Sequence, residues 1–600
     1  MKKICLLLIW TLVFSYSSLW AACTGGGTSC TKSGTIYTCT DASYGCIQDA
    51  VTASTTGDTI NITDTTGRTW ASTLAITRGI SIIGPGTDSL IITWNGGATK
   101  RVITWYPDAP TRTANPLFRV SNFTIDINSN FPDNYGYVFY MLNDTSTALT
   151  KVVIDNMKIK NVSIGRAIGI QGLFQGVAYS NTFTNVYNIF IGMGYNSVGW
   201  GAVTREYGKS SNFFLEDNTI NFTASMNGAW NETGQGFTGI VMRYNTFDLT
   251  NCLTRELWDI HGLQSMSTSL SPCNQSCVGD ANCQPEADCC EQWSTIKAEY
   301  YGNIITNMNN SPYGWINHRG SWLLFYNNRL TANYSVSPYY FQYSCDSCQS
   351  PSSPAYSHHV QNTYVWNNWV NGVVKNYARK NTGADWCSLA AGSPYTIKAN
   401  TDYWNYNVNT LNGSTEKGIN CGSAAPTSDC STGDGYWKTD ASPCSTPPTT
   451  MADMRTYTQS STFYKCTAPN TWEVYYTPYT YPHPLRGEEI TGAIVWGHTS
   501  GVTEPDIRTF ASGWSGTGTI SSSGDSEKIL LASGQYMNSP IVSTGVKAVR
   551  INKDKYRTGT TSVLKYRTCA VSDCSDVPAF TIYSDVFNSL GYVQIRVEAP

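Results

Sequence analysis

The chain has 600 residues, too many for one ordinary compact core, so several units or one elongated repetitive unit are expected. Its net charge of −3, with 14% charged residues, gives no reason to expect nucleic acid or an anionic membrane as a partner. Aromatic residues reach 13%, and together with many turn-forming residues they predict a β-rich protein.

Residues 1–21 predict a secretory signal peptide. Lys2 and Lys3 precede an apolar run over residues 4–14, and Leu19-Trp20-Ala21 offers a cleavage site. The apolar run is too short to span a membrane as a helix, and the rest of the sequence has no other long one. We therefore expect an exported protein without a membrane span, either extracellular or at the cell surface.

The chain has 20 cysteines, and in an exported protein they predict disulfide bonds. Cys5 would leave with the signal peptide, so an odd number remains. One thiol would then be free, paired between chains, or lipidated at Cys23. Five cysteines between residues 273 and 290, with Cys252 upstream, favour a disulfide-stapled insertion over a metal site, because no paired CxxC unit with histidine is present.

Residues 22–55 predict an N-terminal cap that contains disulfides. Within it, the pattern over residues 44–57 is that of a short amphipathic helix with Ile47, Ala50 and Val51 on one face. Such a helix would cover the first open end of a repetitive β-structure.

Asparagine recurs at one place in a short repeated pattern, after an apolar strand and before another apolar residue. The shortest intervals are 25 and 27 residues, and the 58-residue interval contains the cysteine-rich insertion. A period in the twenties predicts a parallel β-solenoid over residues 56–485, with about nine to twelve coils. A series of β-sandwich domains would show more regular hairpins. The recurring residues are Asn122, Asn156, Asn181, Asn218, Asn245, Asn303, Asn328 and Asn368.

Two sets of segments carry a family resemblance. "GDTI" with "TWASTLAITRGISIIGPGT", and later "DYWNYN" with "YYTPYTYPHPL", resemble the first coils and the end of secreted bacterial β-helix proteins of the pectate-lyase-like superfamily. The resemblance covers residues 45–485 and implies a right-handed parallel β-helix. It does not define an activity, because the superfamily includes lyases, hydrolases, epimerases, tailspikes and adhesins. The calcium cluster and catalytic arginine of pectate lyases have no match here.

The pattern changes after residue 485. Residues 486–509 have the composition of a linker, and residues 510–600 alternate as separate strands. They predict a small antiparallel β-sandwich of jelly-roll type, which resembles carbohydrate-binding and adhesive accessory modules. No motif indicates its ligand.

Ionisable residues cluster in "LTRELWDIHGL" and "WINHRGSWLLF". His261 follows Asn245 by 16 residues, and His318 follows Asn303 by 15, so the two histidines are predicted to lie one above the other on adjacent coils. The candidate catalytic residues of this cluster are Arg255, Glu256, Asp259, His261, His318 and Arg319.

The cluster has two chemical interpretations and one structural one. Lyase chemistry requires a base and a cation for a uronate carboxylate, whereas hydrolysis requires two carboxylates. In a strand Glu256 and Asp259 would face opposite sides, which favours an Asp259–His261 pair. The structural alternative is that these side chains only fill a tight bend. Candidate saccharide-binding residues are Tyr339, Tyr340, Tyr343, Trp366 and Trp369, with coil packing as the alternative for the two tryptophans.

The sequence therefore predicts an exported β-helix protein that binds a polysaccharide or a cell-surface glycan. It leaves open whether the protein also cleaves that polysaccharide, as a lyase or a glycoside hydrolase. The alternative is a non-catalytic adhesion or structural protein. No cofactor is expected, although scattered aspartates leave calcium as an option.

Overall fold

The computed structural model divides the chain into two units, residues 1–485 and residues 486–600. Described residues of the first unit are 20–21, 30–97, 99–194, 205–234, 237–253, 257–260, 295–308, 315–318, 320–332, 339–341, 360–374, 378–380, 403–405, 419–427, 429–440 and 448–485. In the second unit they are residue 486 and nine short strands between residues 515 and 598.

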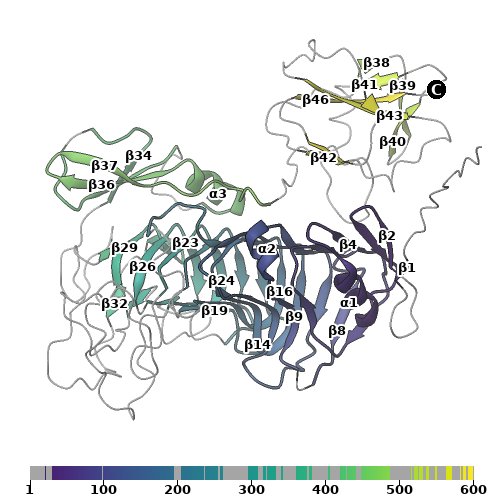
Figure 1. Cartoon of the computed structure of the whole chain (residues 1–600). Coiled ribbons are helices and arrows are strands. Elements are labelled where there is room, and N and C mark those ends of the chain that lie inside the picture. The colour runs from purple at the N-terminus through teal and green to yellow at the C-terminus, as the bar shows by residue number, and fades with distance from the viewer. Residues whose placement is uncertain are drawn as a thin grey trace, which may run out of the picture. The chain divides into compact units, whose positions relative to one another are not determined.

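The first unit is a parallel β-helix, the fold class that the sequence predicts. Each coil contributes strands to three faces, and equivalent strands of successive coils pair in parallel (Figure 1). The first face belongs to a 14-stranded sheet, and its coil strands are β4 Thr59–Ile62, β7 Ser81–Ile83, β10 Phe118–Ser121, β13 Leu149–Asp155, β15 Phe174–Tyr179, β17 Phe213–Glu216, β20 Ile240–Arg243, β23 Lys297–Tyr301, β26 Ser321–Tyr326, β29 Val360–Trp366 and β33 Tyr403–Asn405.

The second and third faces form one 19-stranded sheet, because β14 and β16 continue around the corner between them. The second face contains β5 Arg68–Trp70, β8 Ile91–Trp94, β11 Thr124–Asp126, the first halves of β14 Lys158–Gly172 and β16 Thr182–Met193, then β18 Thr219–Asn221, β21 Thr246–Asp248, β24 Ile304–Met308, β27 Arg329–Ala332, β30 Trp369–Val370 and the antiparallel β31 Val373–Val374. The third face contains β6 Leu74–Ile76, β9 Arg101–Trp105, β12 Tyr137–Asn143, the second halves of β14 and β16, then β19 Trp230–Gly234, β22 Trp258–Ile260, β25 Ile316–His318, β28 Tyr339–Phe341 and β32 Ala378–Lys380.

A ladder of buried asparagines marks the corner between the first and second faces. In each step, the backbone N–H and Nδ2 of one asparagine donate to Oδ1 of the next. Asn218, for example, lies 3.0 Å and 2.9 Å from Asn245 Oδ1 through these two nitrogens. Stacked amides thus satisfy the buried polar groups of the bend. The ladder contains Asn181, Asn218, Asn245, Asn303, Asn328 and Asn368, as the sequence predicts.

Asn122 and Asn156, however, are not members of this ladder. Pairing of Thr124 with Lys158, and of Lys158 with Thr182, places them one residue before the ladder position. Their φ angles of 66° and 49° are left-handed, a conformation that asparagine tolerates well. Because asparagine suits both positions of the bend, the sequence alone did not separate them.

The N-terminal end of the β-helix is closed by helix α1 Tyr44–Ala53, which buries Cys46, Ile47, Ala50 and Val51. Before it, β1 Trp20–Ala21 pairs with β2 Cys30–Ser33, which pairs with β3 Ile36–Cys39. A disulfide joins Cys30 to Cys39. The predicted amphipathic face of the cap helix is therefore confirmed. A second short helix, α2 Ala109–Ala114, lies between β9 and β10 and begins where Asp108 accepts a hydrogen bond from Thr111 N–H.

Residues 419–485 do not continue the coils, although the sequence predicts a solenoid up to residue 485. They form a C-terminal cover composed of β34 Ile419–Gly422, β35 Gly435–Lys438, helix α3 Met451–Gln459, β36 Thr462–Ala468 and β37 Thr471–Tyr476 (Figure 1). A disulfide joins Cys430 to Cys466, and Cys421 is also disulfide-bonded. The correction has a physical reason: the outer side of the first face is apolar and aromatic, and the cover buries it.

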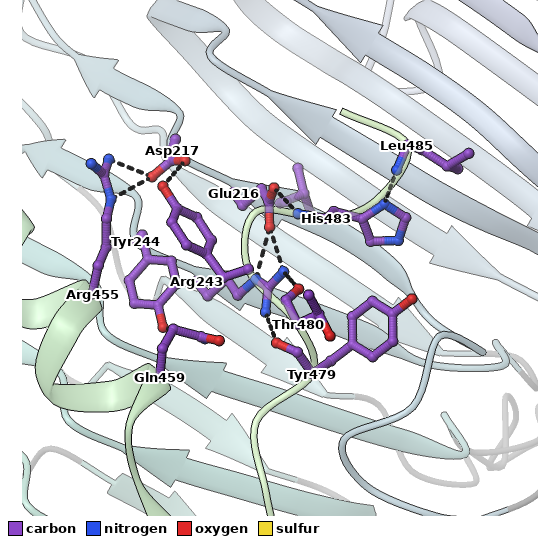
Figure 2. Close-up of polar contacts among 12 residues, drawn as sticks. Glu216, Asp217, Arg243, Tyr244, Arg455, Gln459, Tyr479, Thr480, His483 and Leu485 are labelled. Atoms are coloured by element: carbon purple, nitrogen blue, oxygen red, sulfur yellow. Dashed lines mark hydrogen bonds and ion pairs between the residues drawn. The ribbon is translucent and has the colours of Figure 1, made fainter. Parts of the chain in front are cut away.

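The last part of the cover, residues 477–485, is a strap that crosses the coils of β17 and β20. Figure 2 shows how it is held: the Arg243 guanidinium donates to the Tyr479 and Thr480 carbonyls at 2.6 and 2.8 Å and pairs with Glu216 at 2.7 Å. Glu216 Oε1 in turn accepts a hydrogen bond from the His483 backbone N–H, with an N to O distance of 3.0 Å. Arg243 and Glu216 are both fully buried, so each charge depends on the other and on the strap.

The second unit is described by itself, and only for its backbone. Its strands are β38 Ser515–Gly516, β39 Thr519–Ser523, β40 Ser526–Leu530, β41 Tyr536–Asn538, β42 Ala548–Arg550, β43 Val563–Cys569, β44 Thr581–Ile582, β45 Val586–Asn588 and β46 Tyr592–Glu598. Every pairing among them is antiparallel. A search of the described residues of both units finds no helix long and apolar enough to cross a membrane.

Candidate functional site

Asp259 and His318, the two described members of the predicted Asp–His cluster, lie on the third face, but in another register. β22 pairs with β25 so that Ile260, not His261, is the partner of His318, and Asp259 is the partner of Asn317. The predicted register, which stacked His318 on His261, is therefore wrong by one residue. His261 lies outside the described residues, as do Arg255, Glu256 and Arg319.

His318 points into the core and Asp259 points away from it. Trp258 and Ile260 belong to the core, so Asp259 between them faces outward, where it is nevertheless buried. His318 is fully buried, and burial lowers its pKa to about 3. A neutral, enclosed imidazole on the inner side cannot share a surface with Asp259, and His318 is therefore a core residue.

The predicted aromatic residues that the structure describes are divided among the three faces. Tyr339 and Tyr340 belong to β28, where Tyr340 pairs with Asn317, and Tyr343 lies outside the described residues. Trp366 is fully buried between Tyr326 and Phe463, with ring distances of 4.1 and 4.8 Å.

Trp369 is 1% exposed and packs near Tyr457 of the cover. Trp366 and Trp369 are therefore packing residues, as the alternative of coil packing predicts, and they do not line a sugar groove.

A different group of side chains gathers on the outside of the third face. It spans the coils of β9, β12 and β14, and its tyrosines belong to a small cluster separate from the main core. We call it the arginine–tyrosine surface, and its members are Arg101, Tyr106, Tyr137, Tyr140, Arg166 and Gln171. All of them lie within the described residues 99–194.

Strand register places the two arginines on one line. Arg101 pairs with Tyr137, and Tyr137 pairs with Arg166, so the three occupy equivalent positions on successive coils. Two coils correspond to about 10 Å along the axis of the β-helix. Gly169, on β14, makes room for the rings: a Cβ atom there would lie 2.3 Å from Tyr137 Cδ1.

Each guanidinium lies against a tyrosine ring. The Arg101 guanidinium carbon is 3.9 Å from the Tyr140 ring centroid, and Arg101 also donates a hydrogen bond to the Tyr106 hydroxyl. Arg166 lies 5.3 Å from the Tyr137 centroid and donates to its hydroxyl at 3.2 Å. These contacts orient the guanidinium groups.

Neither arginine is neutralised by an ion pair within the described part of the chain, since every pair found there involves other residues. Arg166 Nε is buried without a hydrogen-bond partner among the same residues. Both arginines are partly exposed. Asp133 interacts electrostatically with Arg166 but makes its ion pair with Lys100, so both guanidinium groups can still receive an anionic ligand.

The phenols of Tyr137 and Tyr106 remain protonated at neutral pH. Burial raises the pKa of Tyr137, and the nearby Arg166 and Arg101 charges only partly oppose that shift. Burial likewise raises the pKa of Tyr106. The Tyr140 hydroxyl donates to Gln171 Oε1 at 2.5 Å. Protonated phenols can donate hydrogen bonds, but they are poor general bases.

Sequence reasoning missed this surface because its members are dispersed. Arg101 and Arg166 belong to coils whose loops differ in length, so no fixed interval from the asparagines relates them. The two arginines are brought together by the strand register, in which Tyr137 pairs with Arg101 on one side and with Arg166 on the other. The sequence does not reveal that register. Among the residues that the structure describes, no group of three or more His, Cys, Asp or Glu is placed to hold a metal ion.

Comparison with known proteins adds little to this picture. No family model matches the chain, and no curated protein matches it. Among solved structures, the chain is similar to the A-module of a mannuronan C-5 epimerase from Azotobacter vinelandii, with 11% identity and a TM-score of 0.28. That alignment covers 54% of this chain and 83% of the other. At this identity and TM-score the likeness carries no argument about function.

Proposed function

We propose that the protein is an exported β-helix that binds an acidic polysaccharide on its arginine–tyrosine surface. The observation that supports this most is the line formed by Arg101, Tyr137 and Arg166 on three successive coils. Guanidinium groups bind carboxylates in a bidentate manner, and the buried rings of Tyr137 and Tyr140 hold the two guanidinium groups in place for such binding.

The direction of the line suggests how the polymer lies. An extended polysaccharide placed along the axis of the β-helix would meet Arg101 and Arg166 about 10 Å apart, with Tyr137 between them. A repeating acidic sugar can satisfy both cations at once. A single short anion could reach only one of them.

Binding is favoured over catalysis. Proton abstraction from a sugar requires a base, and the raised pKa values of Tyr137 and Tyr106 make their phenolates scarce at neutral pH. His318 is enclosed in the core, so it does not provide that base at the surface. Calcium stays a prediction, and so does the export of the chain, with which the Cys30–Cys39 and Cys430–Cys466 disulfides are compatible.

The test is a pair of binding isotherms by calorimetry with the full-length protein. One ligand is a polyuronate, and the other is the same polymer after its carboxyl groups have been reduced to alcohols. We expect saturable, salt-sensitive binding of the polyuronate and binding of the neutral polymer weakened at least tenfold. Equal affinity for the two polymers would contradict the proposal. Release of unsaturated or shortened products during the experiment would replace binding with catalysis.

A further inference from the structure

Three polar side chains meet in a buried place on the outer side of the first face. Lys297 and Glu299 belong to β23, and Asn212 directly precedes β17. All three have 0% exposure. They lie outside the core, because Ala298 and Tyr300, which alternate with them, are core residues. The arginine–tyrosine surface, on the third face, contains none of them.

The Asn212 amide is only half satisfied. Its Nδ2 donates to the Lys209 carbonyl at 3.1 Å and reaches Glu299 Oε1 at 3.5 Å. Its Oδ1 has no hydrogen-bond partner among the described residues. A buried carbonyl oxygen without a partner is unusual and calls for an explanation.

Lys297 and Asn212 approach each other above Gly239. A Cβ atom at Gly239 would lie 2.2 Å from Asn212 Oδ1 and 3.1 Å from Lys297 Cε. The missing side chain therefore gives both groups the same space. The Lys297 amine donates to the Glu206 carbonyl at 2.6 Å and to Ser211 Oγ at 2.9 Å, beside Asn212.

The surroundings favour neutral forms of both ionisable groups. Burial lowers the pKa of Lys297 to about 8, so a substantial part of the amine is neutral near physiological pH. Burial raises the pKa of Glu299, although Gly208 N–H and the Tyr476 hydroxyl each donate to it at 2.9 Å. A neutral amine is a nucleophile, and a protonated carboxyl group can supply a proton.

We propose that Lys297 and Asn212 form an intramolecular amide cross-link in the mature protein, with Glu299 transferring the proton. The Lys297 amine leaves the Glu206 carbonyl and attacks Asn212 Cγ, which forms the new Nζ–Cγ bond. The Cγ–Nδ2 bond then breaks. Glu299, within reach of Nδ2, gives a proton to the departing nitrogen and recovers one from Nζ. One ammonia is released, and neither an oxidant nor any other reactant is needed.

The cross-link would join two coils on either side of the cysteine-rich insertion. It connects the residue before β17 to β23, so β20, β22 and the insertion lie within the closed loop. Closing a long loop restricts the unfolded chain, as a disulfide does, but the amide is insensitive to reduction.

The test is mass spectrometry of the purified, reduced full-length protein after tryptic digestion. We expect a branched peptide that joins residues 210–243 to the segment that contains Lys297, lighter than the sum of the two component peptides by the mass of one ammonia. Trypsin should not cleave after Lys297. Recovery of wild-type peptides with a free Lys297 amine and an intact Asn212 amide would overturn the proposal.

Variants separate the roles. Lys297→Met, Asn212→Ala and Glu299→Gln should each abolish the branched peptide, whereas Lys209→Arg, a neighbouring exposed lysine, should retain it. A cross-link that persists in Glu299→Gln would overturn the role of Glu299. Circular dichroism checks that each variant is folded, and the wild-type digest decides the main point even if one is not.

Discussion

The buried Arg243–Glu216 pair provides a quantitative prediction about the strap. Replacing Arg243 with Met keeps most of the volume but leaves Glu216 as a charge with 0% exposure. It also removes the donors to the Tyr479 and Thr480 carbonyls. Breaking one partner of a buried pair costs about 3–5 kcal/mol, so we expect a loss of that size in the free energy that holds the strap in place.

Hydrogen exchange over residues 477–485 measures this loss directly, because the strap can open without the coils unfolding. The His483 N–H donates a hydrogen bond to Glu216, and its hydrogen should exchange at least a hundredfold faster in Arg243→Met. Arg112→Met is the matched control, since Arg112 and Asp144 form an exposed pair, worth at most about 1 kcal/mol. Unchanged exchange in the strap of Arg243→Met would refute the argument.

Three further predictions concern the coils and the surface. His318 has a folded pKa of about 3, below the ordinary value of 6.5. Its contribution to the free energy of unfolding is therefore complete above pH 6.5 and is lost toward pH 3, by about 1.4 kcal/mol per pH unit. His318→Leu should make the free energy of unfolding depend less on pH in this acid range, and an unchanged pH dependence would count against this. Asn245→Ala removes the acceptor of Asn218 N–H and Nδ2 and should lower the unfolding free energy by about 2–4 kcal/mol in denaturant titrations, more than Asn122→Ala does; equal effects would argue against the ladder. Gly169→Ala would place a methyl group 2.3 Å from Tyr137 Cδ1, so it should weaken polyuronate binding in calorimetry while the melting temperature changes little; unaltered affinity would separate Tyr137 from the binding surface.

The sequence revealed the repeat more reliably than the site. The ladder from Asn181 to Asn368 was predictable because each member needs the same bend and the same amide partners. Register within a strand was not, because loops of variable length separate the bends. An error of one residue in the predicted register assigns a side chain to the wrong side of the sheet. This is why His318 was expected at the surface, whereas it points into the core.

The positions of Trp366 and Arg101 show a second reason why the site could not be predicted from the sequence. Trp366 was a reasonable surface residue in an open coil, but residues 419–485 cover it, and the sequence did not indicate that a later segment would fold back over the first face. Arg101 and Arg166 face the same side only because Tyr137 lies between them in register. Such contacts depend on tertiary structure, and no local pattern encodes them.

The most direct test of the proposed function compares the affinity for a polyuronate of the wild-type protein with that of the double variant Arg101→Gln and Arg166→Gln. Lys151→Gln, which removes one exposed charge from β13 on the first face, is the control. Each charge-assisted contact is worth about 1.5–3 kcal/mol, so we expect the double variant to bind at least a hundredfold more weakly and the control to bind as the wild type does. Equal binding by all three proteins would contradict the assignment of the arginine–tyrosine surface.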